Sequence, residues 1–324
     1  MCTAITFCPD DHYFGRTLDL ERGYHEEITV TPRRFPFSFR KANPLVGHHA
    51  IIGMATVAEG YPLYYEAVNE KGLGLAGLNF LGNAVYFPPA EYRDNVAPFE
   101  LIPWILGQCA TVREAVVLLK RLNLTDIPFS EEYPLSPLHW LLADRTESLV
   151  IESIKQGLQL YTDPVGVLTN NPPFDFHLHH LCHYMQCSKE PPVNRFAEDL
   201  PLAPYSLGMG GMGLPGDLSS PSRFVRAAFT KWNVQSGETE ETNVRQFFHI
   251  LGAVSQPKGC TRLPDGQYEY TRYTSCCNTD RGIYYYTTYE NPQITAVELH
   301  KTALDGDTLV TYPLRTDMVI RGEN

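Results

Sequence analysis

The order of the expected secondary structure constrains the fold of this chain more than any other feature. Strand-like runs follow one another up to Phe80, helix-like runs occupy residues 98–122, and strand-like runs resume at His139. Two further helical stretches precede a final group of strands that begins at Tyr268. Folds built on parallel sheets alternate strands with helices instead. We therefore expect an α+β fold in which sheets are layered with helices, as a single domain over residues 1–324, because no repeat or linker interrupts the chain.

The first twenty residues predict a β-hairpin. Residues 1–7 alternate with the period of a half-buried strand, Pro9-Asp10-Asp11 interrupts the pattern, and residues 13–20 resume it. The second strand would return Arg16 and Asp19 toward Cys2. Residues three apart on an ideal strand face opposite sides, so one of the two must act from the strand end or from a distortion.

Cys2 gives this hairpin a possible chemistry. If an aminopeptidase removes Met1, as is usual before a small residue, Cys2 carries a thiol and a free α-amine on one carbon. The ordinary pKa of an α-amine is about 8 and that of a thiol about 8.5, so the amine can take the thiol proton near neutral pH. Arg16 is the nearest candidate cation and Asp19 the nearest partner for an ammonium. On Met-Cys alone, a terminal residue without a role, with Arg16 and Asp19 as surface charges of a strand, is the simpler interpretation.

Two later segments place polar groups where a site could form. Pro172-Pro173 ends a strand just after Asn170, which presents a side-chain amide at a strand end. Such an amide can donate to a developing oxyanion, although a turn asparagine is a common alternative. Ser220 is a plausible N-cap followed by Pro221, which puts Arg223 in the first turn of a helix. The helix dipole does not favour a cation there, so we expect Arg223 to serve another purpose, such as pairing with a carboxylate.

Five motifs together resemble a known family, the choloylglycine hydrolases, which contains the bile salt hydrolases and the penicillin V acylases. The motifs are Met-Cys-Thr-Ala-Ile at the start, Phe-Gly-Arg-Thr-Leu-Asp at 14–19, Ala-Gly-Leu-Asn-Phe at 76–80, Leu-Thr-Asn-Asn-Pro at 168–172, and Leu-Pro-Gly-Asp with Pro-Ser-Arg-Phe within 214–224. They cover essentially the whole chain in the family's order and spacing.

The resemblance implies a fold, a mechanism and a site. The fold would be the four-layer αββα arrangement of N-terminal-nucleophile hydrolases, with two stacked antiparallel sheets between helix layers. The reaction would be hydrolysis of an amide through a thioester on Cys2, which acts as nucleophile and base. The other catalytic residues would be Arg16 and Asp19 beside Cys2, Asn79 and Asn170 as oxyanion donors, and Arg223 as a supporting charge. No cofactor and no metal would be needed.

The resemblance also implies a substrate and an assembly. The substrate would be a bile acid conjugated to glycine or taurine, and the assembly a homotetramer. The apolar steroid body would be bound by Leu18, Tyr24, Tyr61, Phe129 and Leu138. Penicillin V acylase is the nearest alternative, but acylases of this family tend to carry tyrosine at the position of Asn79, so asparagine favours bile salts.

Composition excludes several other classes. The formal net charge of −11 and the pI near 5.5 argue against nucleic acid as a partner, because phosphate binding needs clustered Lys and Arg. No run approaches the 18 or so apolar residues of a membrane span, and no signal peptide is visible. The eight cysteines form no C-x-x-C pair. We expect a cytoplasmic protein with reduced thiols.

Two further motifs suggest functions that their contexts do not favour. Histidines at 177, 179, 180 and 183, with nearby cysteines, could make a non-enzymatic metal-binding protein, but a solvated helix face explains them more simply. Residues 208–213 match G-x-G-x-x-G, yet prolines precede them and Leu214-Pro215-Gly216 follows. A dinucleotide site needs a strand before this motif and a helix through it, so we expect a loop.

Overall fold

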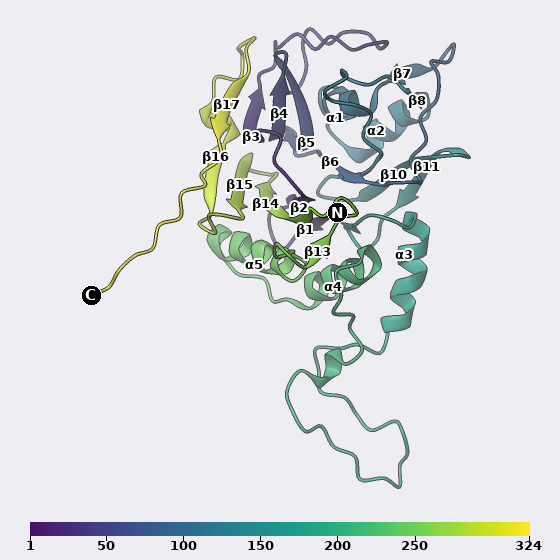
Figure 1. The fold of residues 1–324 in the computed structure, drawn as a ribbon, viewed down its shortest axis with the longest axis vertical. Helices are drawn as coiled ribbons and strands as arrows, with labels where there is room; N and C mark the ends of the chain where they lie inside the picture. The colour runs from purple at the N-terminus through teal and green to yellow at the C-terminus, as the bar shows by residue number, and fades with distance from the viewer.

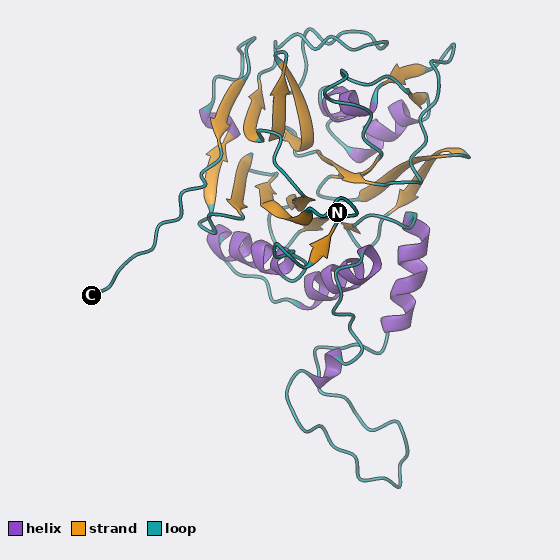
Figure 2. Ribbon diagram, in the orientation of Figure 1, coloured by secondary structure: helices purple, strands orange, loops and turns teal.

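Two antiparallel sheets stacked face to face form the centre of the computed structural model, which describes residues 1–324. Helices lie on the outer side of each sheet (Figures 1 and 2). This arrangement confirms the expected α+β class and the αββα layering.

The first sheet has seven strands in the order β12-β1-β2-β14-β15-β16, with β13 paired to β14. Its strands are β1 (Cys2–Phe7), β2 (Tyr13–Leu20), β12 (Val167–Leu168), β13 (Thr261–Arg262), β14 (Tyr268–Asn278), β15 (Ile283–Thr288) and β16 (Thr295–Glu298). The hairpin of β1 and β2 therefore lies inside the sheet, with a neighbouring strand on each side.

The second sheet has eight strands in the order β11-β10-β9-β6-β5-β4-β3-β17. Its strands are β3 (Glu27–Thr31), β4 (Ile51–Ala58), β5 (Tyr61–Asn69), β6 (Gly74–Asn79), β9 (Leu138–Ala143), β10 (Ser148–Ile154), β11 (Gly157–Thr162) and β17 (Val310–Pro313). Asn79 is the last residue of β6, at the edge of the space between the sheets.

The helices form the two outer layers. On the first sheet, α4 packs against β1 and α5 against β14, while on the second sheet α1 packs against β5 and β6. The α-helices are α1 (Leu101–Leu106), α2 (Val112–Leu119), α3 (Phe174–Leu181), α4 (Ser220–Asn233) and α5 (Glu240–Gly252). The remaining elements are the 3₁₀ turns η1 (Pro98–Glu100), η2 (Cys182–Tyr184), η3 (Met209–Gly211) and η4 (Leu299–Lys301), and the short strands β7 (Asp94–Val96) and β8 (Leu122–Leu124).

Helix ends differ from the expectations by a few residues. The helix expected over 98–109 is a 3₁₀ turn followed by the short α1, and Leu122 belongs to β8 instead of α2. Ser219, not Ser220, is the N-cap of α4. The expected start of α2 is correct, because the Thr111 hydroxyl accepts a hydrogen bond from the Glu114 amide. None of the helices combines the length and the hydrophobicity that crossing a bilayer requires.

The register of the hairpin decides which side chains reach the space between the sheets. Cys2 pairs with Leu18 and Ala4 pairs with Arg16, so the side chains of these residues share one face of the sheet. That face is turned toward the second sheet. Thr3, Thr17 and Asp19 alternate onto the other face, which is covered by the helices. Arg16 and Asp19 therefore reach the end of β1 from opposite sides of the sheet.

Close packing of β2 against β14 generates a stability prediction. A methyl group at Gly15 would lie 2.1 Å from the carbonyl oxygen of Ser275, which belongs to the backbone of the sheet. We expect Gly15→Ala to lower the free energy of unfolding by about 2 kcal/mol or more, because overpacking shifts backbone atoms. Denaturant titration of wild type and Gly15→Ala measures this difference in the free energy of unfolding. Gly47→Ala is the matched control, since nothing lies within 4 Å of its added carbon. Equal stability of both variants would contradict the packing described.

Candidate active site

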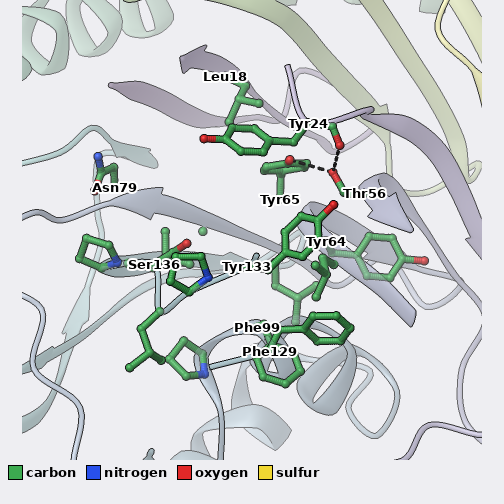
Figure 3. A pocket seen from close by; sticks show the side chains of 18 of the residues that line it. Leu18, Tyr24, Thr56, Tyr64, Tyr65, Asn79, Phe99, Phe129, Tyr133 and Ser136 are labelled. Carbon is green, nitrogen blue, oxygen red and sulfur yellow. Dashed lines mark hydrogen bonds between the residues drawn. The ribbon is translucent and has the colours of Figure 1, made fainter. Parts of the chain in front are cut away.

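Cys2 opens into a cavity of about 320 Å³ between the sheets and the α1 layer. Its side chain is 2% exposed, so the thiol is reached only through this space. Most of the wall is apolar, with Arg16 and Asn79 as polar members close to the cysteine end. The cavity wall includes Leu18, Leu20, Tyr24, Leu63, Tyr65, Phe99, Ile102, Phe129, Tyr133, Leu135, Leu138 and Trp140 (Figure 3). A ligand with a broad apolar body and a polar group at one end suits this shape.

Arg16 lies in the cavity wall beside Cys2 and is fully buried. Its guanidinium donates to the carbonyl oxygens of Thr17 and Tyr65, at 3.2 Å each, and to that of Gly77. Its Nη2 has no partner. Burial alone would lower the pKa of Arg16, but the negative groups around it, Cys2 and Glu66 among them, outweigh burial and raise that pKa. The arginine is thus a permanent cation with a spare donor beside Cys2.

Asp19 lies on the helix-covered face of β2. Its carboxylate accepts from the Thr271 hydroxyl at 2.7 Å and from the Gln256 amide at 2.8 Å. Its backbone carbonyl accepts from the Met1 amine at 3.0 Å, and that amine also contacts the Glu269 carboxylate. Burial lowers the pKa of the Met1 amine, with Cys2 and Asp19 opposing the change. The N-terminus is therefore enclosed by acceptors.

Asn170, just beyond β12, bridges Cys2 and Asn79. Its Oδ1 accepts from the Cys2 backbone nitrogen at 2.8 Å, and its Nδ2 donates to the Asn79 carbonyl at 2.7 Å. The Arg223 guanidinium is a second donor to Oδ1. These two donors and the Asn79 carbonyl fix which end of the Asn170 amide is oxygen and which is nitrogen. One hydrogen on Nδ2 remains for a further acceptor.

Arg223 is fully buried in the first turn of α4, where it contacts the same group of atoms. It donates to the Asn170 Oδ1 at 2.6 Å, to the Thr3 hydroxyl at 2.7 Å and to the Cys2 carbonyl. The expected pairing with a carboxylate is wrong, because every partner of Arg223 is a neutral oxygen. Burial lowers the pKa of Arg223, and the charge of Asp19 opposes that shift.

Four of the five residues expected to bind the substrate line the cavity: Leu18, Tyr24, Phe129 and Leu138. Tyr61 does not, which corrects its expected position. Its ring packs at 5.8 Å from Phe99 and 5.9 Å from Phe129, so it supports two wall residues from behind. Of the expected catalytic residues, Cys2, Arg16 and Asn79 line the cavity, whereas Asp19, Asn170 and Arg223 lie around Cys2 without lining it.

A short polar strip crosses the otherwise apolar wall. The Thr56 hydroxyl donates to the Tyr24 carbonyl at 2.8 Å and lies 2.9 Å from the Tyr65 hydroxyl, as the dashed lines in Figure 3 mark. Because these groups already satisfy one another, the strip can meet a hydroxyl of a ligand without leaving a buried polar atom unpaired.

Two buried histidines hold the Asn170 segment and were not predicted. His139 is 3.0 Å from the Thr169 carbonyl and 3.0 Å from Glu152, and its ring stacks on Phe80. The Nε2 of His177 is 2.9 Å from the Asn170 carbonyl. Consecutive carbonyls are thus fixed from the second sheet and from α3. Two features of the sequence could have indicated them: a lone histidine in the apolar run 138–143, and a histidine three positions after Phe174, which places both on one face of α3.

His177 is committed to this contact and to packing against Phe224, with ring centroids 4.9 Å apart. The chain contains no group of three or more His, Cys, Asp or Glu side chains placed to hold a metal ion. The expected solvated helix face is therefore wrong for His177, which is buried, and correct for His179 and His183, which are exposed. The metal-binding alternative has no geometric support. The glycine motif at 208–213 forms a loop with one 3₁₀ turn, as expected. All eight cysteines are free thiols.

His177 generates a prediction about acid stability. Burial lowers the pKa of His177 to about 4, whereas an unfolded histidine titrates near its ordinary value of about 6.5. The folded state therefore binds fewer protons between these values, and stability falls as pH falls from about 6.5 to about 4. We expect the free energy of unfolding of His177→Gln to fall by roughly 3 kcal/mol less than that of wild type over this pH range.

The measurement is the free energy of unfolding from pH 7 to pH 4 for both proteins. Gln keeps a donor for the Asn170 carbonyl, so the difference between the two curves isolates the titration. His300→Gln, an exposed site, is the control. Parallel curves for wild type and His177→Gln would contradict the predicted titration.

Comparisons with known proteins agree with this geometry. The family model described as linear amide C–N hydrolases, choloylglycine hydrolase family, matches residues 2–312. A bile salt hydrolase/transferase from Lactiplantibacillus plantarum is 56% identical over 317 residues, covering 98% of each chain.

Two solved structures resemble the fold. The crystal structure of a mutant conjugated bile acid hydrolase from Clostridium perfringens has a TM-score of 0.92 at 36% identity, covering all of both chains. The penicillin V acylase from Agrobacterium tumefaciens has a TM-score of 0.76 at 20% identity over 97% of this chain and 91% of its own, which shows a shared fold only. The chain belongs to the choloylglycine hydrolase family of linear amide C–N hydrolases.

Proposed function

We propose that the protein hydrolyses the amide bond between a bile acid and glycine or taurine, with Cys2 as an N-terminal nucleophile. The observation that carries this proposal is the position of Cys2. Its thiol opens into an apolar cavity, while its backbone nitrogen, the future α-amine, lies 2.8 Å from Asn170. The names of the relatives that match along the whole chain supply the substrate class.

In the proposed first step the α-amine of mature Cys2 accepts the thiol proton, and the thiolate attacks the amide carbon. Asn170 Oδ1 and the backbone carbonyl of Asp19 are acceptors near the N-terminus, and they favour the protonated amine that results. Arg16 favours the thiolate by its charge. The remaining hydrogen of Asn170 Nδ2 and the backbone amide of Asn79 would donate to the oxyanion.

In the second half the C–N bond breaks, and the leaving amine takes the proton from the ammonium. Water then attacks the thioester after giving a proton to the same amine, which releases the bile acid and restores the thiol. An amine in place of water would turn hydrolysis into acyl transfer, the second activity in the name of the Lactiplantibacillus relative.

The cavity wall supports a steroid as the acyl group. Leu18, Leu138 and the rings of Phe99 and Phe129 form broad apolar surfaces, and the Thr56–Tyr65 strip offers polar contacts for hydroxyls. The phenoxyacetyl group of penicillin V is much smaller than this space. Asn79 in place of tyrosine keeps the cysteine end of the cavity open, which also favours the bile salt over penicillin V.

The test combines intact mass with turnover. We expect purified protein to lack Met1, to release glycine or taurine from conjugated bile salts, and to release 6-aminopenicillanic acid from penicillin V far more slowly. Cys2→Ser should reduce turnover by more than about a hundredfold, because a hydroxyl is a weaker nucleophile at neutral pH. Cys8→Ser, at an exposed thiol, is the matched control. Full turnover by a chain that retains Met1 would refute the mechanism, and preference for penicillin V would refute the substrate.

We also propose that the protein is a homotetramer and that residues 188–208 form the contact between copies. This segment loops far from the body below α3 and α4 (Figure 1). The Ser188 amide donates to the Gly210 carbonyl at 2.8 Å, so the two ends of the loop lie side by side. Val193, Phe196 and Leu207 on the loop are 76%, 84% and 95% exposed. An extended loop cannot bury such side chains against itself, so a second copy is the fitting cover.

Light scattering after size-exclusion chromatography tests the assembly. We expect wild type to have the mass of a tetramer and the double variant Phe196→Ser/Leu207→Ser to dissociate, because the contact loses apolar area. Val46→Ser, at an equally exposed residue outside the segment, should leave the mass unchanged. A monomeric wild type, or a double variant that stays tetrameric, would contradict the proposed contact.

A further inference from the structure

A buried carboxylate stands behind Arg16 and takes no part in the mechanism above. Glu66 lies on β5 in the second sheet, and its side chain is 2% exposed. Its Oε2 is 3.8 Å from the Arg16 Nε, so the two groups form an ion pair without a direct hydrogen bond. The Nε proton goes to the Thr17 carbonyl instead. The contribution of Glu66 to Arg16 is therefore charge.

Two tyrosines from the first sheet hold this carboxylate. The Tyr273 hydroxyl donates to Oε2 at 2.7 Å, and the Tyr284 hydroxyl donates to Oε1. Both rings are buried. The pKa of Glu66 is raised, because burial outweighs the opposing effects of Arg16 and of the neighbouring hydroxyls. The Arg16 cation and the two tyrosine donors are the groups that favour the ionised carboxylate. A buried, unpaired carboxylate would otherwise be costly, so the three contacts form a built arrangement.

The charges around Cys2 then fall into two pairs. Arg16 lies beside Cys2 on the side of the second sheet, with Glu66 behind it, while Arg223 and Asp19 lie on the helix side. With both carboxylates ionised, the two cations and the two anions cancel. The other charged groups nearby are the N-terminal amine, Glu269 beside it and Glu132 in the outer cavity wall.

We propose that Glu66 is a positioning residue that sets the electrostatic potential at Cys2 by neutralising Arg16. Without Glu66 the site would carry one excess positive charge. That charge would lower the pKa of both the thiol and the α-amine, and an amine of lower pKa is a weaker base for the thiol proton. The thiolate would be more abundant but the proton transfers slower. The expected effect on turnover rests on the proposed function, whereas the expected effect on the Cys2 thiol does not.

The test measures the Cys2 thiol directly. The mature protein is alkylated with iodoacetamide between pH 4 and pH 10, and mass spectrometry follows the modification rate of the N-terminal peptide. We expect Glu66→Gln to move the pH midpoint of alkylation down by about half to one unit, because it removes a nearby negative charge. Turnover should fall at the same time. An unchanged midpoint in folded Glu66→Gln would overturn the proposal.

Two variants separate charge from structure. Glu66→Asp keeps the charge and disturbs the tyrosine contacts, so its midpoint should remain that of wild type. Glu100→Gln removes another fully buried carboxylate, one that accepts backbone amides of Arg40 and Ala97 and does not pair with Arg16. Its midpoint should not move, whatever stability it loses. An equal shift in Glu100→Gln would also overturn the proposal.

If Glu66→Gln does not fold, Tyr284→Phe replaces it. Loss of this donor raises the pKa of Glu66 further, so a larger fraction of the carboxylate is protonated at a given pH and the midpoint of Cys2 alkylation should move down by a smaller amount. No movement would count against Glu66 as the counter-ion. Because alkylation needs no substrate, a protein that failed to cleave bile salts would still give a clear result.

Discussion

The structure around Cys2 depends on burying two arginines, each with a carboxylate on its own side of the first sheet. Moving an ion out of water costs several kcal/mol even after the protein relaxes, so such groups persist only where partners satisfy them. The sheet meets this requirement by dividing the charges between its two faces. Arg16 and Glu66 share the space between the sheets, and Arg223 and Asp19 share the helix side.

This division follows directly from the period of a strand. Arg16 and Asp19 are three residues apart, so they cannot act from one face of β2, and the sequence alone indicates that conflict. In the folded chain β1 and β2 keep a regular register, and the irregularity lies in β14, between Thr271 and Tyr273 opposite Asp19 and Leu18. Cys2 lies at the first position of β1, where both faces of the sheet remain within reach. A nucleophile in the middle of a strand could be served from one face only.

The sequence was most informative where a motif is local. The hairpin, the layering and the gathering of five residues around Cys2 were predictable because each belongs to a short, recognisable segment. Glu66 was not predicted, since its tyrosine partners lie more than 200 positions away and only the tertiary fold joins them. A single carboxylate in the apolar run 61–68 was the available signal. Tyr61 was misplaced because alternation along β5 gives the face of a side chain but not which layer of rings it joins.

Arg223 occupies a position where a cation destabilises the helix that carries it. A cation in the first turn of α4 opposes the helix dipole, and full burial adds a desolvation cost that no carboxylate contact offsets. An apolar side chain would suit this position better if packing were the only demand. Its donors instead fix the carbonyl of Cys2 and the side-chain oxygen of Asn170, which in turn accepts from the Cys2 backbone nitrogen. The hydrogen bonds to Cys2 and Asn170 therefore explain why a cation occupies this position, and α4 fixes Arg223 where it can make them.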